Sequence, residues 1–334
     1  MPVVRFLLLF IGLTALVPAQ AVVFKIATIA PDGTHWMEEM RKGADEIDKQ
    51  TQGRVQIRFY PGGVMGNDST VLRKIRIGQL QGGAITGGGL AEIYGDTQVY
   101  SIPFTFNSYA EVDYVRKRVD PLLIAGLKEK GFISFGISEG GFAYLMSKTP
   151  VAGVDDLKGH KVWVPEGDEI SRASFDAAHI SPISLPLTDV LTGLQTGMID
   201  TIASSTVGAI ALQWYTQVKY LNDAPLMYLY GTMMVKRDQF EKLSPADQAV
   251  VKRVMGDVFA RLDVTNRSDN EAAKDVLKKH GITFLHSTEA ETRHWREVIA
   301  PAMTKLKSSG QFSPAILKAQ DDAIAEFRKG AAKH

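Results

Sequence analysis

The chain has 334 residues, of which 38 are Lys or Arg and 37 are Asp or Glu, so its formal net charge is only +1. A nearly neutral chain without a run of basic residues is not expected to bind nucleic acid. The sequence contains no cysteine, which excludes a disulfide framework and a lipid-anchored cysteine.

The N-terminus, residues 1–21, has the features of a secretory signal peptide. Arg5 gives it a positive start, an apolar run follows over 6–17, and Ala19–Ala21 (AQA) is a small-x-small cleavage site. The run is shorter than the ~20 residues that a spanning helix needs, and no later segment has ~18 consecutive apolar residues. We therefore expect a mature chain that begins at Val22 and lies in the periplasm. Because that chain is longer than one hydrophobic core usually covers, we expect two domains.

The first third of the mature chain alternates strands and helices. Residues 22–29 are mostly apolar and β-branched, which is typical of a strand buried on both faces. Apolar spacing predicts a helix over 36–47, alternation predicts a strand over 55–60, and a second helix is expected over 68–77. This order with short connections favours parallel strands and an α/β architecture.

The middle of the chain continues in the same way. A helix is expected over 188–197, with Thr188 as its cap. Strands are expected over 133–137, 142–146, 161–164 and 200–203.

The longest predicted element begins at Ser244, which together with Pro245 and Asp247 resembles a capped helix N-terminus. No Gly or Pro interrupts 257–279, and Gly281 follows as a stop signal. A helix over about 245–279 would be roughly 50 Å long at 1.5 Å per residue. Since this exceeds the width of one small domain, we expect the helix to bridge two.

One motif suggests catalysis. Gly136–Gly140 (GISEG) matches the G-x-S-x-G pattern of a hydrolase nucleophile, with Ser138 as the serine. The pattern requires a helix directly after the serine, whereas Gly141 and β-prone residues follow here. We interpret the segment as a turn between strands, and a periplasmic serine hydrolase that uses Ser138 stays an alternative.

Other chemistry finds little support. The glycine-rich segment 82–89 lacks the Lys-Ser/Thr of a phosphate-binding loop, so we interpret it either as a wall of a small-molecule cleft or as a place of tight packing. The seven histidines are scattered and show no zinc-binding spacing. We therefore expect no metal, no cofactor and no catalytic residues, and ligand binding without catalysis becomes the leading interpretation.

Five segments carry a resemblance to a known family. They are Val64–Asp68 (VMGND), Ile102–Tyr109 (IPFTFNSY), Asp156–Pro165 (DLKGHKVWVP), Leu194–Asp200 (LQTGMID) and Trp214–Leu221 (WYTQVKYL). In this order and spacing the chain resembles the extracytoplasmic solute receptors of tripartite ATP-independent periplasmic (TRAP) transporters. The resemblance extends over essentially the whole mature chain.

The resemblance implies two α/β lobes joined by hinge strands and braced by the long helix. We expect lobe one to contain 22–143 and about 230–270, and lobe two to contain 144–229 and about 271–334. It also implies that the lobes close on a small molecule, because the ligand contacts both lobes only in the closed state. The loaded receptor would then dock on the membrane subunits of the transporter.

The chain departs from the family pattern at one important position. Most members carry an arginine that binds the ligand's carboxylate where this chain has Trp163. A lone indole N–H is a poor partner for a desolvated carboxylate. We therefore expect a ligand that is uncharged, aromatic or lipid-like. The alternatives are that Arg172 or Lys161 replaces the arginine, or that Trp163 belongs to the core.

The resemblance also suggests further ligand-binding candidates. Thr86 lies in the glycine-rich segment, whereas the others lie on or at the ends of strands, namely Thr28, Ile29, Phe142, Tyr144, Ser204 and Ser205. Trp214 is interpreted as mainly structural. Besides the hydrolase, a receptor that feeds a sensor protein stays open as an alternative function.

Overall fold

The computed structural model describes residues 21–331. The predicted signal peptide, residues 1–21, lies outside the described residues except for Ala21. Within the described part, nine strands form one mixed sheet and two more form a small separate sheet. None of the described helices is long and apolar enough to cross a membrane.

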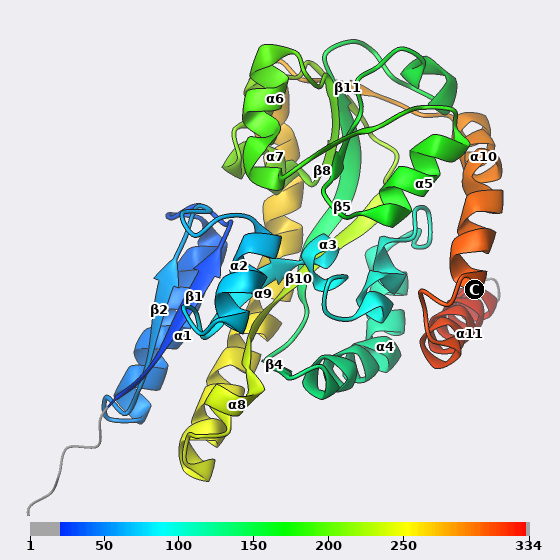
Figure 1. Cartoon of the computed structure of the whole chain (residues 1–334). Helices are drawn as coiled ribbons and strands as arrows, with labels where there is room; N and C mark the ends of the chain where they lie inside the picture. Colours follow the sequence, from blue (N-terminus) through cyan, green and yellow to red (C-terminus); the bar gives the residue numbers. More distant parts are fainter. Residues whose placement is uncertain (1–20, 332–334) are drawn as a thin grey trace, which may run out of the picture.

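The lower part of Figure 1, called lobe one, is built on parallel strands. The strand β1 (Val22–Thr28) pairs in parallel with β2 (Val55–Tyr60) on one side and with β3 (Gly82–Thr86) on the other. The helix α1 (His35–Gln50) packs on the long helix α9 (Pro245–Lys279), and α2 (Asp68–Arg76) packs against β3. The predicted β-α-β-α start is therefore confirmed.

The upper part, called lobe two, contains the shorter strands. The strand β9 (Tyr220–Asn222) pairs with β11 (Thr283–Leu285), whereas β6 (Trp163–Pro165) and β7 (Ile183–Leu185) form the small sheet. The elements that surround these strands are β8 (Thr201–Ser204), α5 (Glu169–Ala177), α6 (Val190–Thr196), α7 (Thr206–Ala211) and α10 (Glu289–Ser308). Thr188 does not cap α6, because Leu187–Asp189 after Pro186 forms a 3₁₀ turn first.

Two long antiparallel strands join the lobes. The strand β10 (Met227–Lys236) pairs with β3 and β4 (Phe132–Ser134) in lobe one, and with the first half of β5 (Ser138–Ser147). The second half of β5 pairs with β8 and β9 in lobe two. The chain thus passes between the lobes in β5 and β10, which are hydrogen-bonded to each other. This is the arrangement expected of hinge strands.

The predicted brace is confirmed in its full length. The helix α9 spans Pro245–Lys279, and the Ser244 side chain caps it by accepting a hydrogen bond from the backbone N–H of Asp247. It contacts α1 in lobe one, β5 in the hinge and α7 in lobe two. Figure 1 shows it running from yellow to orange behind both lobes.

Four more of the described helices complete the fold. They are α3 (Gly87–Leu90), α4 (Tyr109–Glu129), α8 (Arg237–Phe240) and α11 (Pro314–Ala331). The last of these packs on α4, beside lobe one, although it follows α10 of lobe two in the chain. The exact residues at which the lobes divide stay a prediction.

Buried charges tie the hinge to its neighbours. The side chain of Glu139 on β5 is fully buried and accepts hydrogen bonds from Arg267 on α9 and from the Tyr228 hydroxyl on β10. Arg267 also pairs with Asp113 on α4. Because a buried carboxylate requires such partners, this cluster fixes the position of α9 relative to the hinge strands.

Candidate functional site

The two lobes touch each other along one rim. The Asn67 side-chain N–H, just before α2 of lobe one, donates to the Glu166 carboxylate of lobe two at 3.2 Å. Next to it, a Cβ atom on Gly63 would lie only 3.1 Å from Cγ2 of Thr188. These contacts join loops that are about a hundred residues apart in the chain, so the two lobes meet at this rim. The candidate site is the group of side chains that lie next to this rim in the two lobes.

The lobe-one wall combines Thr86 with a carboxylate that the sequence analysis did not single out. Asp68 accepts hydrogen bonds from the backbone N–H of Thr86, at 3.2 Å, and from its hydroxyl. Thr86 in turn caps α3 by accepting from the N–H of Gly89. A Cβ atom on Gly89 would lie 2.5 Å from the Asp68 carboxylate oxygen, so the glycine leaves the room that this acid occupies.

Burial changes the acidity of Asp68. It raises the pKa of this carboxyl to about 6, although the hydrogen bonds from Thr86 act in the opposite direction. Asp68 lies inside the VMGND segment, and a carboxylate at the start of a helix usually lies in solvent. The family resemblance of this segment therefore indicated the position of the site. The low solvent exposure of the Asp68 carboxylate, by contrast, arises only from tertiary packing.

A second buried acid lies in lobe two. Asp168 caps α5 and accepts hydrogen bonds from the N–H and hydroxyl of Ser171, and burial raises the pKa of its carboxyl. Tyr230 on β10 has a raised pKa, chiefly because of burial and further because of the charge of Asp168. Asp168 therefore lies close to the hinge strand as well. Among the described residues, no Lys or Arg forms a salt bridge with Asp68 or Asp168.

Trp163 is placed on β6, as predicted, with only 4% of its surface exposed. Its indole N–H donates to the backbone carbonyl of Leu185 at 3.0 Å, and its ring meets Trp214 edge-on at 5.4 Å between centroids. The N–H is therefore already used, and Trp163 lies in the same buried hydrophobic cluster of lobe two as Trp214, as the core alternative expects. Its contact with a ligand stays a prediction. Trp214 packs in the core, as interpreted from the sequence.

The two alternative replacements for the arginine, Lys161 and Arg172, have other partners. The Lys161 ammonium donates to the carbonyl of Gly197 at 2.7 Å on the surface of lobe two. Arg172 is partly exposed and lies 3.9 Å from the carboxylate of Glu169. Each has a local partner, and neither is hydrogen-bonded to a residue of the rim.

The strand candidates divide into two groups. Thr28 lies next to the rim, because its carbonyl accepts from the N–H of Gly63 and its hydroxyl accepts from Ala30, directly after Ile29. Phe142 packs instead on Tyr109 of α4, at 4.8 Å between ring centroids.

The remaining candidates, Tyr144, Ser204 and Ser205, lie near α9 or cap a helix. Lys274 of α9 lies 5.5 Å from the Tyr144 ring, and Ser204 pairs with Tyr144 across the sheet. Ser205 caps α7 by accepting from the N–H of Gly208. The roles of all these candidates in ligand binding stay predictions.

Ser138 does not have the surroundings of a nucleophile. Its hydroxyl is buried and has no hydrogen-bond partner, so no base is placed to activate it. The chain continues after Ser138 as the strand β5 and not as a helix, which removes the strained turn that the motif requires. The interpretation as a turn between strands holds for Gly136 and Ile137, which connect β4 to β5, whereas Ser138–Gly140 belong to the hinge strand β5.

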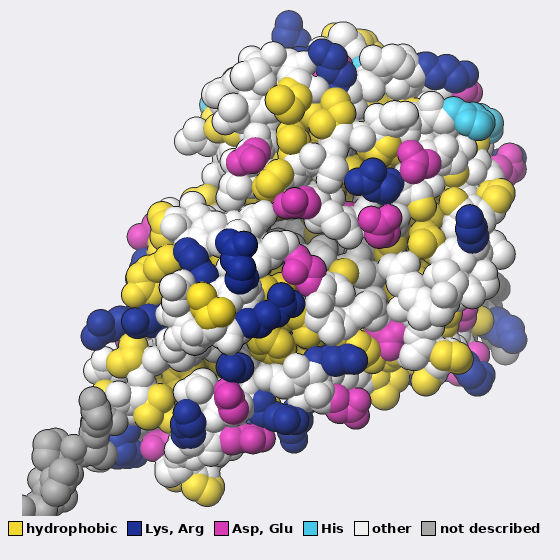
Figure 2. Space-filling view, viewed as in Figure 1, with side chains coloured by type: hydrophobic (Ala, Val, Ile, Leu, Met, Phe, Trp, Pro, Cys, Tyr) yellow, Lys and Arg dark blue, Asp and Glu magenta, His cyan; other side chains and the backbone are white. Residues whose placement is uncertain are grey.

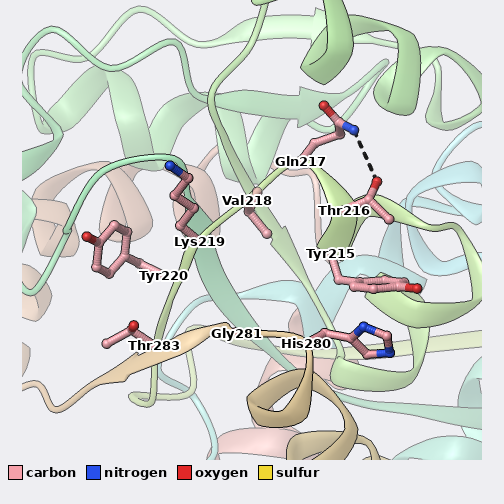
Figure 3. A pocket seen from close by; sticks show the side chains of 9 residues that line it. All are labelled: Tyr215, Thr216, Gln217, Val218, Lys219, Tyr220, His280, Gly281 and Thr283. Carbon is pink, nitrogen blue, oxygen red and sulfur yellow. Dashed lines mark hydrogen bonds between the residues drawn. The ribbon is translucent and has the colours of Figure 1, made fainter.

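A separate open hollow of about 720 Å³ lies in lobe two, away from the rim. Figure 3 shows Tyr215 and His280 side by side at one end of it and Lys219, Tyr220 and Thr283 at the other. The ring centroids of Tyr215 and His280 are 4.9 Å apart. Within residues 21–331, no group of three or more His, Asp or Glu side chains is arranged to hold a metal ion.

Comparison with known proteins agrees with this architecture. The model of the bacterial extracellular solute-binding proteins, family 7, matches residues 26–309. The C4-dicarboxylate-binding periplasmic protein of Rhodobacter capsulatus is 25% identical over 311 residues, which cover 89% of this chain and 92% of that protein.

Solved structures share the fold. The galactonate complex of a sugar acid binding protein from Advenella mimigardefordensis has a TM-score of 0.85 at 20% identity and covers 92% of this chain and 98% of the other. The orotic acid complex of a TRAP periplasmic solute binding protein from Desulfovibrio salexigens has a TM-score of 0.84 at 19% identity, with 91% and 99% covered. The resemblance found in the motifs is thus confirmed, and the chain belongs to family 7 of the bacterial extracellular solute-binding proteins, a family of receptors and not of enzymes.

Proposed function

We propose that this protein is the periplasmic receptor of a TRAP transporter, which captures a small molecule between its lobes and delivers it to the membrane subunits. The observation that carries the proposal is the contact of the two lobes over the candidate site, at Asn67–Glu166 and Gly63–Thr188, in a fold hinged by β5 and β10. A ligand held between such lobes contacts both only when they close, so binding increases the closed population.

The ligand of this receptor is less acidic and more apolar than those of its relatives. Two features support this proposal. Trp163 stands where the resemblance implies an arginine, and its N–H is already bonded to Leu185. Two acids border the site and have raised pKa values, the partly buried Asp68 and the buried Asp168. A carboxylate ligand would meet these acids without a cation to offset its desolvation, whereas an uncharged aromatic or lipid-like molecule would not.

A matched pair of ligands tests the proposal. Orotate and uracil share one ring, and only orotate carries a carboxylate. We expect calorimetric titration of the mature receptor to give tighter binding for uracil than for orotate, or no binding of orotate. Binding of orotate alone would contradict the proposed ligand class but would leave the receptor role intact.

The variant Trp163→Arg extends the test. A charge-assisted hydrogen bond contributes about 1.5–3 kcal/mol, so a guanidinium at this position is expected to strengthen binding of orotate relative to uracil roughly 10- to 100-fold. The control Trp163→Leu removes the aromatic ring without adding a charge, and it should not change the preference toward orotate.

A further inference from the structure

A basic surface lies on lobe one although the chain as a whole is almost neutral. Figure 2 shows Lys and Arg side chains gathered over the region of α2, β1 and β2. The side chains that form it are Lys25 on β1, Arg58 on β2, and Arg73, Lys74 and Arg76 on α2. We call these five residues the α2 patch.

Strand register and a short loop bring these residues together from distant parts of the sequence. Lys25 and Arg58 are direct neighbours in the parallel pairing of β1 and β2. The backbone of Lys25 also exchanges hydrogen bonds with Gln81, which follows α2 after one short turn. The last turn of α2 therefore lies beside the two strand cations, and no linear run of basic residues reveals the patch.

The charges of the patch are not neutralised within the lobe. Among the described residues, no acidic side chain forms a salt bridge with a member of the patch, and Lys74 donates to the backbone carbonyl of Met65. Nearby Arg41 and Arg54 are by contrast paired with Asp32 and Asp247. The helix dipole stabilises the cations in the last turn of α2. It does not stabilise Lys25 and Arg58, which lie on strands. Like charges on neighbouring strands are destabilising on their own.

Two exposed apolar side chains flank the patch. Val64, in the loop before α2, is 71% exposed, and Ile77, at the end of α2, is 66% exposed. Arginine together with exposed apolar residues is typical of protein interfaces. Val64 directly follows Gly63, which touches Thr188 of lobe two at the rim. The patch is therefore continuous with the line where the lobes close.

We propose that the α2 patch, with Val64 and Ile77, docks on an acidic, periplasm-facing surface of the transporter's membrane subunits. This proposal rests on the proposed receptor function. Because the patch adjoins the rim, a partner that covers both would also contact lobe two in its closed position. The same partner would thereby distinguish the closed receptor from an open one.

The neighbouring charges favour a protein partner over a lipid surface. Across the rim, Glu166 and Asp189 of lobe two are exposed. A uniformly anionic lipid surface that attracted the patch would repel these two acids. A protein can instead present acidic groups to the patch and different groups to lobe two.

Charge reversal tests the proposal. The variant Arg73→Glu/Arg76→Glu is compared with the matched control Lys279→Glu/Arg293→Glu, which reverses two exposed charges in α9 and α10, far from the patch in the sequence. Binding to the membrane subunits in nanodiscs is measured at low and moderate salt, with empty phosphatidylglycerol nanodiscs as a second arm. Thermal unfolding of both variants checks that they remain folded.

We expect the patch variant to bind the subunits at least about tenfold more weakly than the wild type, with less dependence on salt, and the control to bind like the wild type. Equal binding by all three proteins, or equal weakening of both variants, would overturn the α2 patch but not the receptor role. Equal binding of the wild type to empty nanodiscs would identify lipid as the partner and also overturn it. A folded wild type that binds neither surface would refute the receptor role itself.

Discussion

Replacing Asp68 with Asn should stabilise the protein, and the gain should depend on pH. The raised pKa means that the folded protein binds the Asp68 proton more tightly than the unfolded chain does. The stability that this proton provides is complete below the unfolded pKa of 3.8 and is lost as the pH rises through about 6. Asn keeps an oxygen to accept the hydrogen bonds of Thr86 but carries no charge to bury.

The size of the effect follows from the shift. A change from 3.8 to about 6 corresponds to at most about 3 kcal/mol at neutral pH, since one pKa unit equals 1.36 kcal/mol. For a chain of this length that free energy raises the unfolding temperature by roughly 4–5 °C.

Thermal unfolding of Asp68→Asn and the wild type between about pH 4 and pH 8 measures this effect. The variant should melt higher at pH 8, and the difference should vanish near pH 4. The control Asp45→Asn, an exposed acid on α1, should show no such trend. A constant difference at all pH values, or a less stable variant at pH 8, would refute the reasoning about the buried carboxylate.

Three further changes probe the hinge, the rim and the glycine-rich wall. Arg267→Met leaves the Glu139 carboxylate buried without its cation and should lower stability by about 3–5 kcal/mol; the double variant with Glu139→Leu should recover most of this loss in urea unfolding. In the cysteine-free chain, Asn67→Cys/Glu166→Cys should react with a short bismaleimide faster when a bound ligand closes the lobes, and an unchanged rate would argue against closure. Gly89→Ala should destabilise the protein by about 1–3 kcal/mol, because the new methyl group overlaps the carboxylate of Asp68. An unchanged unfolding temperature would contradict this packing.

Local sequence signals predicted much of the fold. The cap at Ser244 and the long stretch free of Gly and Pro predicted α9 to within a residue, because helix boundaries depend on local chemistry. The prediction that Thr188 caps a helix was wrong, because a 3₁₀ turn begins directly after Pro186 and includes Thr188. Apolar spacing does not reveal this preference of the local backbone.

The site was harder to predict because its properties arise from contacts between distant segments. Asp68 loses contact with solvent only because Thr86 and Gly89 pack against it, and nothing in its own segment signals this. The resemblance drew attention to Trp163, but the sequence did not show that the carbonyl of Leu185 takes its N–H. The α2 patch was also hidden, because its strand and helix cations are dispersed along the chain.

The ligand class is tested most directly by a thermal-shift screen of the protein against two sets of molecules, small carboxylates and uncharged aromatic or lipid-like compounds. A ligand at a hundred times its dissociation constant stabilises the folded state by about 2.7 kcal/mol, which is readily measured. We expect shifts among the uncharged compounds. Shifts among the carboxylates alone would contradict the proposed apolar ligand and would mean that another donor replaces the arginine missing at Trp163.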